Sequence, residues 1–138
     1  MANWLVKSEP SKYSWEKLVA EGRTHWDGVR NFQASNNLKA MKKGDRVFFY
    51  HSNEGLAIAG IAEVAREYHP DPSDKSGRFG MVDLKPVMPM RRPVTLAEIK
   101  AEPRLADFAL VRQSRLSVMP VTPTEWKLVC AMGETKAC

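Results

Sequence analysis

The sequence contains only two cysteines in 138 residues, Cys130 and Cys138, and both lie near its C-terminal end. So few thiols exclude the disulfide framework of small secreted domains, and they also exclude a CxxC metal site. We therefore expect a reduced, cytoplasmic protein. Long apolar runs are also lacking: none approaches the roughly 20 residues that span a bilayer. Residues 1–10 have no basic segment followed by an apolar stretch, so we expect neither secretion nor membrane association.

The motifs of common enzyme classes are absent as well. The chain has no GxSxG, P-loop or GxGxxG, which removes the usual evidence for hydrolase, nucleoside triphosphate and dinucleotide sites. His25, His51 and His69 form no i, i+3 or i+4 pair and lie far from the cysteines, so we predict no metal site and no cofactor. Cys130 falls on an apolar helix face, where core packing is expected rather than a nucleophile. No catalytic residue is predicted.

The overall composition is typical of one globular domain. Hydrophobic residues make up 43% and charged residues 27%, and this length is enough to bury a core without disulfides. We expect a single domain over residues 1–138 that acts as a monomer. Lys and Arg outnumber Asp and Glu by 21 to 16, for a net charge of +5. This excess permits nucleic-acid binding without establishing it.

Strand and helix signals alternate irregularly along the chain. Four segments have the composition of strands: residues 3–7, 46–52, 56–64 and 81–87. Helix starts are expected at three capping residues: Ser14, Thr95 and Thr122. Residues 68–80 are expected to form an exposed loop, and Pro86 suits either an edge position or the end of the last of the four strands. Because no regular strand-helix-strand repeat appears, we predict an α+β domain around a curved or barrel-like sheet.

The segment 46–52, RVFFYHS, is the strongest strand signal. Strand alternation divides it into two sets, with Val47, Phe49 and His51 on one face and Phe48 and Tyr50 on the other. We expect one of these two faces to be the core face.

Four polar and aromatic segments interrupt the apolar strands: KSEP at 7–10, HWDGVRN at 25–31, YHS at 50–52 and RQSRLSV at 112–118. Taken singly, each has an ordinary explanation, with Trp26 as core filler, Ser8 as a turn residue and Arg115 as a surface charge. If the segments converge, they supply a π face, hydroxyls, amides and guanidinium groups. These are the groups that recognise a nucleobase and its phosphates.

The second segment continues to residue 37 and is the densest of the four. Asp27 and Gly28 predict a turn, and a helix running through residues 38–41 is expected to follow it. Arg30 and Asn31 then lie at or near the first turn of that helix, where free N–H groups attract anions or polar ligand edges. We therefore expect a binding site beside the Trp26 ring.

The polar segments closely resemble those of the EVE-domain family. The resemblance rests on motifs in order along the chain: WLVKSEP at 4–10, WDGVRN at 26–31, Gly44-Asp45 followed by YHS at 50–52, RPVTL at 92–96 and RLSV at 115–118. It runs from about Asn3 to about Gly133. It implies a PUA-like fold, a mixed sheet curled into a pseudo-barrel and related to the YTH domains that read methylated adenine in RNA. It also implies a pocket for a flipped, modified base, chiefly modified cytosine in DNA.

The resemblance carries over to individual positions. It implies that Trp26 and Tyr50 form aromatic walls that stack on the base. The groups expected to hydrogen-bond the base edge are Ser8, Asn31, Ser52 and Ser114. The groups expected to contact phosphates are Lys7, Arg30, Arg112 and Arg115. His51 is equally consistent with a ligand contact and with structural support of the pocket.

Two positions depart from the family pattern. Ser35 stands where the family usually has Arg, which implies that one basic contact near the pocket is missing. Phe79 stands near a common Trp, which leaves the contribution of the 68–80 loop open.

Three functions are consistent with these residues. The first is a non-enzymatic reader of modified nucleic acid, with DNA favoured and RNA as an alternative. The second is an enzyme that acts on a nucleotide or modified base, with Glu9, Asp27 or His51 supplying acid-base chemistry. The third is an interaction module whose pocket has lost its ligand. The sequence favours the first, because no nucleophile, metal set or paired acids accompany the aromatic and basic residues.

Overall fold

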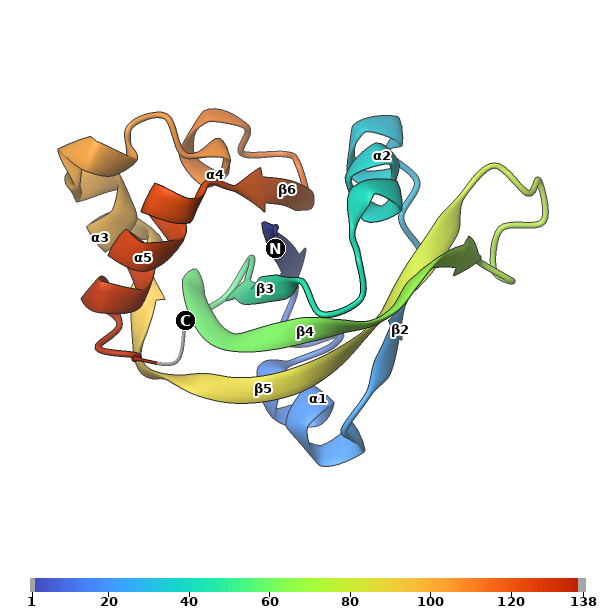
Figure 1. Ribbon diagram of the computed structural model, residues 1–138, viewed down its shortest axis with the longest axis horizontal. Helices are drawn as coiled ribbons and strands as arrows, with labels where there is room; N and C mark the ends of the chain where they lie inside the picture. The colour runs from blue at the N-terminus through green and yellow to red at the C-terminus, as the bar shows by residue number, and fades with distance from the viewer. Residues whose placement is uncertain (1, 137–138) are drawn as a thin grey trace.

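The computed structural model describes residues 2–136, which form one mixed sheet with short helices packed around it (Figure 1). The strands are β1 (Asn3–Ser8), β2 (Thr24–Trp26), β3 (Arg46–His51), β4 (Ala57–Pro70), β5 (Gly80–Thr95) and β6 (Val118–Val121). The helices are α1 (Trp15–Glu21), α2 (Phe32–Ala40), α3 (Leu96–Ala101), the 3₁₀ turn η1 (Pro103–Leu105), α4 (Ala109–Arg112) and α5 (Pro123–Met132). The sheet order is β2-β5-β4-β3-β1-β6, with β1 and β3 parallel and the other pairs antiparallel. The expected α+β fold is confirmed.

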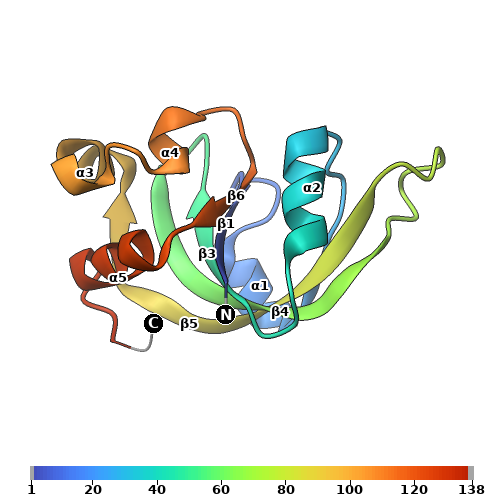
Figure 2. The same ribbon diagram turned by 45° about the horizontal axis from the view of Figure 1, so that its top comes forward.

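The long hairpin of β4 and β5 curves around the other strands (Figures 1 and 2). Its register shifts at four places along the pair, and such bulges bend a strand and interrupt its hydrogen-bond ladder. Of the two roles expected for Pro86, the strand end is wrong, because β5 continues to Thr95. Strand β2 pairs only with residues 82–84, and the ladder to β4 is interrupted near Pro86, so a residue without an N–H is tolerated there. The expected loop is also shorter than predicted, since residues 68–70 belong to β4.

Strand β3 lies inside the sheet between β4 and β1. Four consecutive residues of it, Val47 to Tyr50, are all buried, so both of its faces pack into the core. The expectation of a single core face is therefore wrong. Phe48 stacks on Trp126 of α5, with ring centroids 3.8 Å apart, while Phe49 contacts Trp15 of α1 at 5.6 Å. Elements on both sides of the curved sheet thus cover this strand.

The predicted helix caps are confirmed. The Ser14 side chain accepts a hydrogen bond from the Lys17 N–H, and Thr95 and Thr122 both form capping boxes. Cys130 is buried on α5, as expected, but it is not a free thiol, so the expectation of a reduced side chain does not hold there. Cys138 lies outside the described residues.

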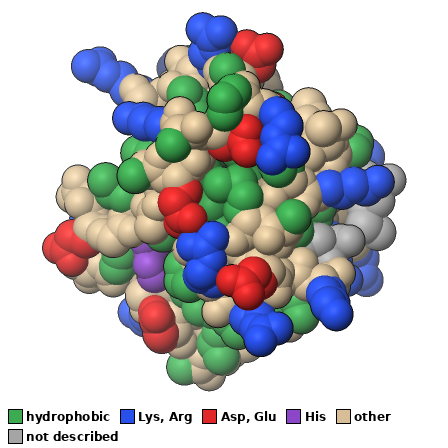
Figure 3. Space-filling view, turned by 90° about the vertical axis from the view of Figure 1, so that its left-hand side faces the viewer, with side chains coloured by type: hydrophobic (Ala, Val, Ile, Leu, Met, Phe, Trp, Pro, Cys, Tyr) green, Lys and Arg blue, Asp and Glu red, His purple; other side chains and the backbone are tan. Residues whose placement is uncertain are grey.

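The face that carries α3 and α5 has interspersed basic, acidic and hydrophobic side chains (Figure 3). Among residues 2–136, every helix is too short or too polar to cross a membrane.

Candidate functional site

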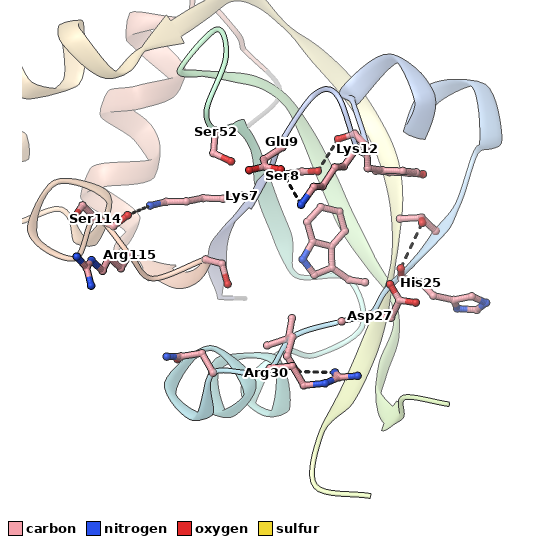
Figure 4. A pocket seen from close by; sticks show the side chains of 17 residues that line it. Lys7, Ser8, Glu9, Lys12, His25, Asp27, Arg30, Ser52, Ser114 and Arg115 are labelled. Carbon is pink, nitrogen blue, oxygen red and sulfur yellow. Dashed lines mark hydrogen bonds and ion pairs between the residues drawn. The ribbon is translucent and has the colours of Figure 1, made fainter. Parts of the chain in front are cut away.

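A pocket of about 720 Å³ opens where the parallel strands β1 and β3 end (Figure 4). Its lining comes from four separate parts of the chain: the end of β1 and the turn after it, β2 with the connection to α2, Ser52 after β3, and the connection between α4 and β6. The lining residues are Lys7, Ser8, Glu9, Lys12, Tyr13, Thr24, His25, Trp26, Asp27, Gly28, Val29, Arg30, Asn31, Ser52, Ser114, Arg115 and Ser117. The fold thus brings together polar segments that are far apart in sequence.

Trp26, at the end of β2, is the central aromatic side chain of the lining. It is partly buried and meets Phe49 and Tyr13 at nearly perpendicular ring angles, with centroids 5.6 and 6.3 Å away. Tyr13 donates its hydroxyl to the Glu21 carboxylate at 2.6 Å, and burial together with this acid raises its pKa to about 12. The indole is therefore held by a rigid aromatic frame, as a stacking surface requires.

The turn after Trp26 is fixed by Asp71, whose side chain is fully buried. The Asp71 carboxylate accepts hydrogen bonds from the Gly28 N–H at 2.9 Å, from Arg30 at 3.3 Å, and from the N–H and hydroxyl of Ser73. Burial by itself acts to raise the pKa of Asp71, but these hydrogen bonds outweigh it and lower the pKa to about 2. A charged group at the base of the β4–β5 loop thus holds the pocket wall.

The opposite wall carries cationic groups. Lys7 donates from Nζ to the Ser114 carbonyl at 2.8 Å, and partial burial lowers the pKa of its ammonium group. Arg115 is exposed and lies beside it, as Figure 4 shows. A second hollow of about 360 Å³ adjoins the pocket and shares Asn31, Ser114 and Arg115 with it. This side of the pocket therefore has a basic rim, which favours anions.

Three predicted hydrogen-bonding residues take part in the local architecture of the pocket. Ser8 donates its hydroxyl to the Tyr13 carbonyl at 2.6 Å, and its own carbonyl accepts the Ser52 N–H at 2.9 Å. Asn31 caps α2, because its Oδ1 accepts the Ala34 N–H at 2.9 Å. The cap uses only the Oδ1 atom of Asn31, a residue that also lines the pocket, and the serine hydroxyls can still accept.

Three other predicted site residues lie elsewhere. Tyr50 is 3% exposed and belongs to the core, because the strand that carries it is covered on both faces. His51 accepts the Trp15 N–H through Nε2 at 3.0 Å, and burial lowers its pKa, so it acts as a neutral support for α1. Arg112 donates to the Ala106 carbonyl and to Asp107, and it lines only the second hollow.

The two positions that depart from the family pattern also lie outside the pocket lining. Ser35 is 2% exposed, and its hydroxyl is 3.4 Å from the Tyr68 hydroxyl between α2 and β4. Phe79 packs on Phe32, with ring centroids 5.0 Å apart. Both departures therefore act first on the packing of α2 against the hairpin.

Histidines that the sequence keeps apart meet in the fold. His25 and His69 both approach Oδ1 of the buried Asp83, at 2.7 and 3.2 Å, and the three ligand atoms lie within 4.8 Å of one another. Their spacing is close to that of a metal site. Arg23, however, donates to the other oxygen of Asp83 at 2.8 Å. Burial opposes the charge on Asp83, but the hydrogen bonds from Arg23 and His25 prevail and lower its pKa. We therefore interpret the cluster as a network of ionic and hydrogen-bonding contacts that holds β2 against β5.

Two important residues were missing from the sequence prediction. Tyr13 stands between the KSEP motif and the Ser14 cap, and its aromatic character next to a motif was the only available signal. Asp71 lies 43 residues from Gly28, and nothing local connects them.

Comparison with known proteins identifies the relatives of the chain. The EVE domain family model matches residues 2–132. Human thymocyte nuclear protein 1 is 36% identical over an alignment that covers 96% of this chain and 74% of that protein. Rpa0253 from Rhodopseudomonas palustris has a solved structure that is 60% identical, with a TM-score of 0.93 over 97% of this chain and 94% of that one.

A further structure, human THYN1 protein in complex with 5-methylcytosine containing DNA, superposes with a TM-score of 0.91. It is 36% identical and covers 99% of each chain. The predicted resemblance is thus confirmed, and so is the PUA-like fold.

Proposed function

The chain belongs to the EVE domain family, and from this premise we propose that it is a non-enzymatic reader of modified nucleic acid. The ligand is a modified base, most directly a modified cytosine in DNA, that is flipped out of the duplex into the pocket. The observation that carries the proposal is the human THYN1 structure with 5-methylcytosine DNA, since its fold matches this one over nearly the whole chain. The pocket volume of about 720 Å³ lies within the range of small-molecule sites.

The lining supplies the chemistry that such a ligand needs. Trp26, framed by Tyr13, provides the stacking surface. Cytosine carries an exocyclic amino donor beside acceptors, which matches hydroxyl acceptors on Ser52 and Ser114 and the amide donor of Asn31. We assign Lys7 and Arg115, which both line the pocket, to the phosphates on either side of the flipped nucleotide.

A reader rather than an enzyme is supported by the states of the available acids and bases. Glu9 is paired with Lys12 at 3.1 Å and accepts from Asn53 at the same distance. His51, the strongest base candidate, is turned toward α1 and does not line the pocket. Asp27 lines the pocket but is exposed, with no buried base beside it in the lining.

The proposal is tested with matched oligonucleotides that carry cytosine or modified cytosine, as DNA and as RNA, at one fixed salt concentration. We expect saturable binding that prefers the modified DNA and leaves the base chemically unchanged. Equal affinity for all oligonucleotides would refute the reader, and turnover of the modified base would show an enzyme instead.

Trp26→Ala is the first variant to measure. Loss of base stacking is expected to weaken binding of modified DNA by about 1–3 kcal/mol and to remove the preference for the modification. Val19→Ala, which shortens an exposed side chain outside the lining, is a control for a general effect of side-chain truncation. A folded Trp26→Ala protein that keeps the preference would remove Trp26 from the pocket wall.

A further inference from the structure

An exposed aromatic pair stands outside the pocket. Phe32 is 63% exposed, the highest value among the large hydrophobic side chains that the structure describes as exposed. Its ring lies 5.0 Å from that of Phe79, at a tilt of 36°. The guanidinium group of Arg30 lies over the Phe79 ring at 5.7 Å. Residues from α2 and from the β4–β5 loop thus build one small apolar surface.

This surface is attached directly to the pocket rim. Phe32 is the first residue of α2 and follows Arg30 and Asn31, which both line the pocket. Gln33, on its other side, lines the second hollow. The backbone at Phe32 is held by the Asn31 cap, and the Arg30 side chain is bound to Asp71 and Ser73. Its position relative to the pocket is therefore fixed.

Packing of the β4–β5 loop against α2 does not account for the exposure of the Phe32 side chain. Single exposed hydrophobic residues are common on protein surfaces, and a contact between Phe32 and Phe79 helps to hold the loop. A residue that serves only this contact would gain by burying its ring, whereas Phe32 leaves nearly two thirds of its surface in solvent. The exposed ring is available to a partner beside a pocket whose rim is basic.

We propose that Phe32, supported by Phe79, is an apolar wedge that packs into the base stack at the place that the flipped nucleotide leaves. The inference rests on the proposed function. Flipping costs unstacking and unpairing energy, and proteins that kink DNA insert Phe and similar side chains between base steps. The wedge offsets part of this cost in a duplex. A free nucleoside has no stack to open, so the wedge contributes nothing to its binding.

The difference between duplex and nucleoside gives the test. Phe32→Ala is expected to weaken binding of a duplex with one modified cytosine about tenfold, which corresponds to about 1.4 kcal/mol. Binding of the modified nucleoside itself should stay unchanged. A 2-aminopurine next to the modified base should report less flipping with the variant. Phe32→Trp, which keeps a stacking ring, should restore the duplex affinity.

Val19→Ala is the matched control, because Val19 is 50% exposed on α1 and lies outside the pocket lining. Thermal unfolding shows whether each variant is folded. Duplex affinity equal to that of Val19→Ala would overturn the wedge and leave the reader standing. An equal loss for duplex and nucleoside would also overturn it, since Phe32 would then be part of the pocket. A wild-type protein that binds neither ligand would overturn both proposals.

Discussion

Asp71 shows how one buried carboxylate determines the shape of the binding segment. Its side chain is fully buried, yet it carries four hydrogen bonds from Gly28, Arg30 and Ser73. A buried acid is costly unless its charge is satisfied in this way. The turn that positions Trp26 and Asn31 therefore depends on a residue of the β4–β5 loop.

Asp71→Asn is expected to lower the free energy of unfolding at pH 7 by about 1–3 kcal/mol, because buried donors lose their acceptor. The pKa of Asp71 is lowered in the folded state to about 2, against about 3.9 for an unfolded aspartate. Its contribution is therefore complete above the unfolded value and is lost as the pH falls through about 2. Urea denaturation between pH 7 and 2 should show the gap between wild type and variant closing with acid.

Asp74→Asn is the control for this prediction. Asp74 belongs to the same loop but accepts hydrogen bonds from Ser76 and Phe79, within the loop itself. We expect a smaller loss of stability for this variant. Equal losses for the two variants would mean that Asp71 stabilises only the loop and not the pocket wall.

At the scale of elements, the start of α2 has two roles, one in folding and one in the pocket. Asn31 caps the helix with its Oδ1 and also lines the pocket. A Ser cap is about as good as an Asn cap, but serine has no amide donor. Substitutions at this position can therefore separate folding from recognition.

Asn31→Ser is expected to keep the stability of the protein and to weaken binding of modified DNA by about 1–3 kcal/mol, through the loss of a buried hydrogen bond. Asn31→Ala should lose the same affinity and also about 1 kcal/mol of stability. Thermal unfolding and DNA titration of both variants provide the measurement. If Asn31→Ser bound as tightly as the wild type, Asn31 would be a cap alone.

At the scale of the whole molecule, the positions of the cations predict phosphate binding better than the net charge of +5 does. Arg30 is bound to Asp71, and Arg112 to Asp107. Among residues 2–136, Arg115 lines both hollows without an ion pair of its own. We therefore propose Arg115 as the phosphate contact among these three.

Arg115→Ala is expected to weaken DNA binding for modified and unmodified sequences alike, and to reduce the slope of log affinity against log salt by about 1. Arg112→Ala, with its cation already paired, should leave the slope nearly unchanged. Titrations at several salt concentrations would check both. A slope that responds to Arg112→Ala and not to Arg115→Ala would reverse the assignment.

The sequence by itself determined the local features. The caps at Ser14, Thr95 and Thr122 depend on side chains and backbone groups three residues apart, so the local pattern was sufficient. The ordered motifs also identified the family, and with it the fold. The sequence also indicated that the segment around Trp26 lies at a pocket, because its polar residues are not typical of a core.

Only the tertiary structure decided which side chains reach the pocket. Tyr50 and Trp26 are both aromatic residues within polar motifs, so the sequence does not distinguish them. Tyr50 lies on β3, which is between β4 and β1 and is buried on both faces. Trp26 lies on β2, an edge strand that leaves it partly exposed. Asp71 reaches Gly28 across 43 residues because the curved hairpin brings its loop back to β2. Such contacts depend on sheet order and curvature, which arise from packing of the whole chain and have no local signal.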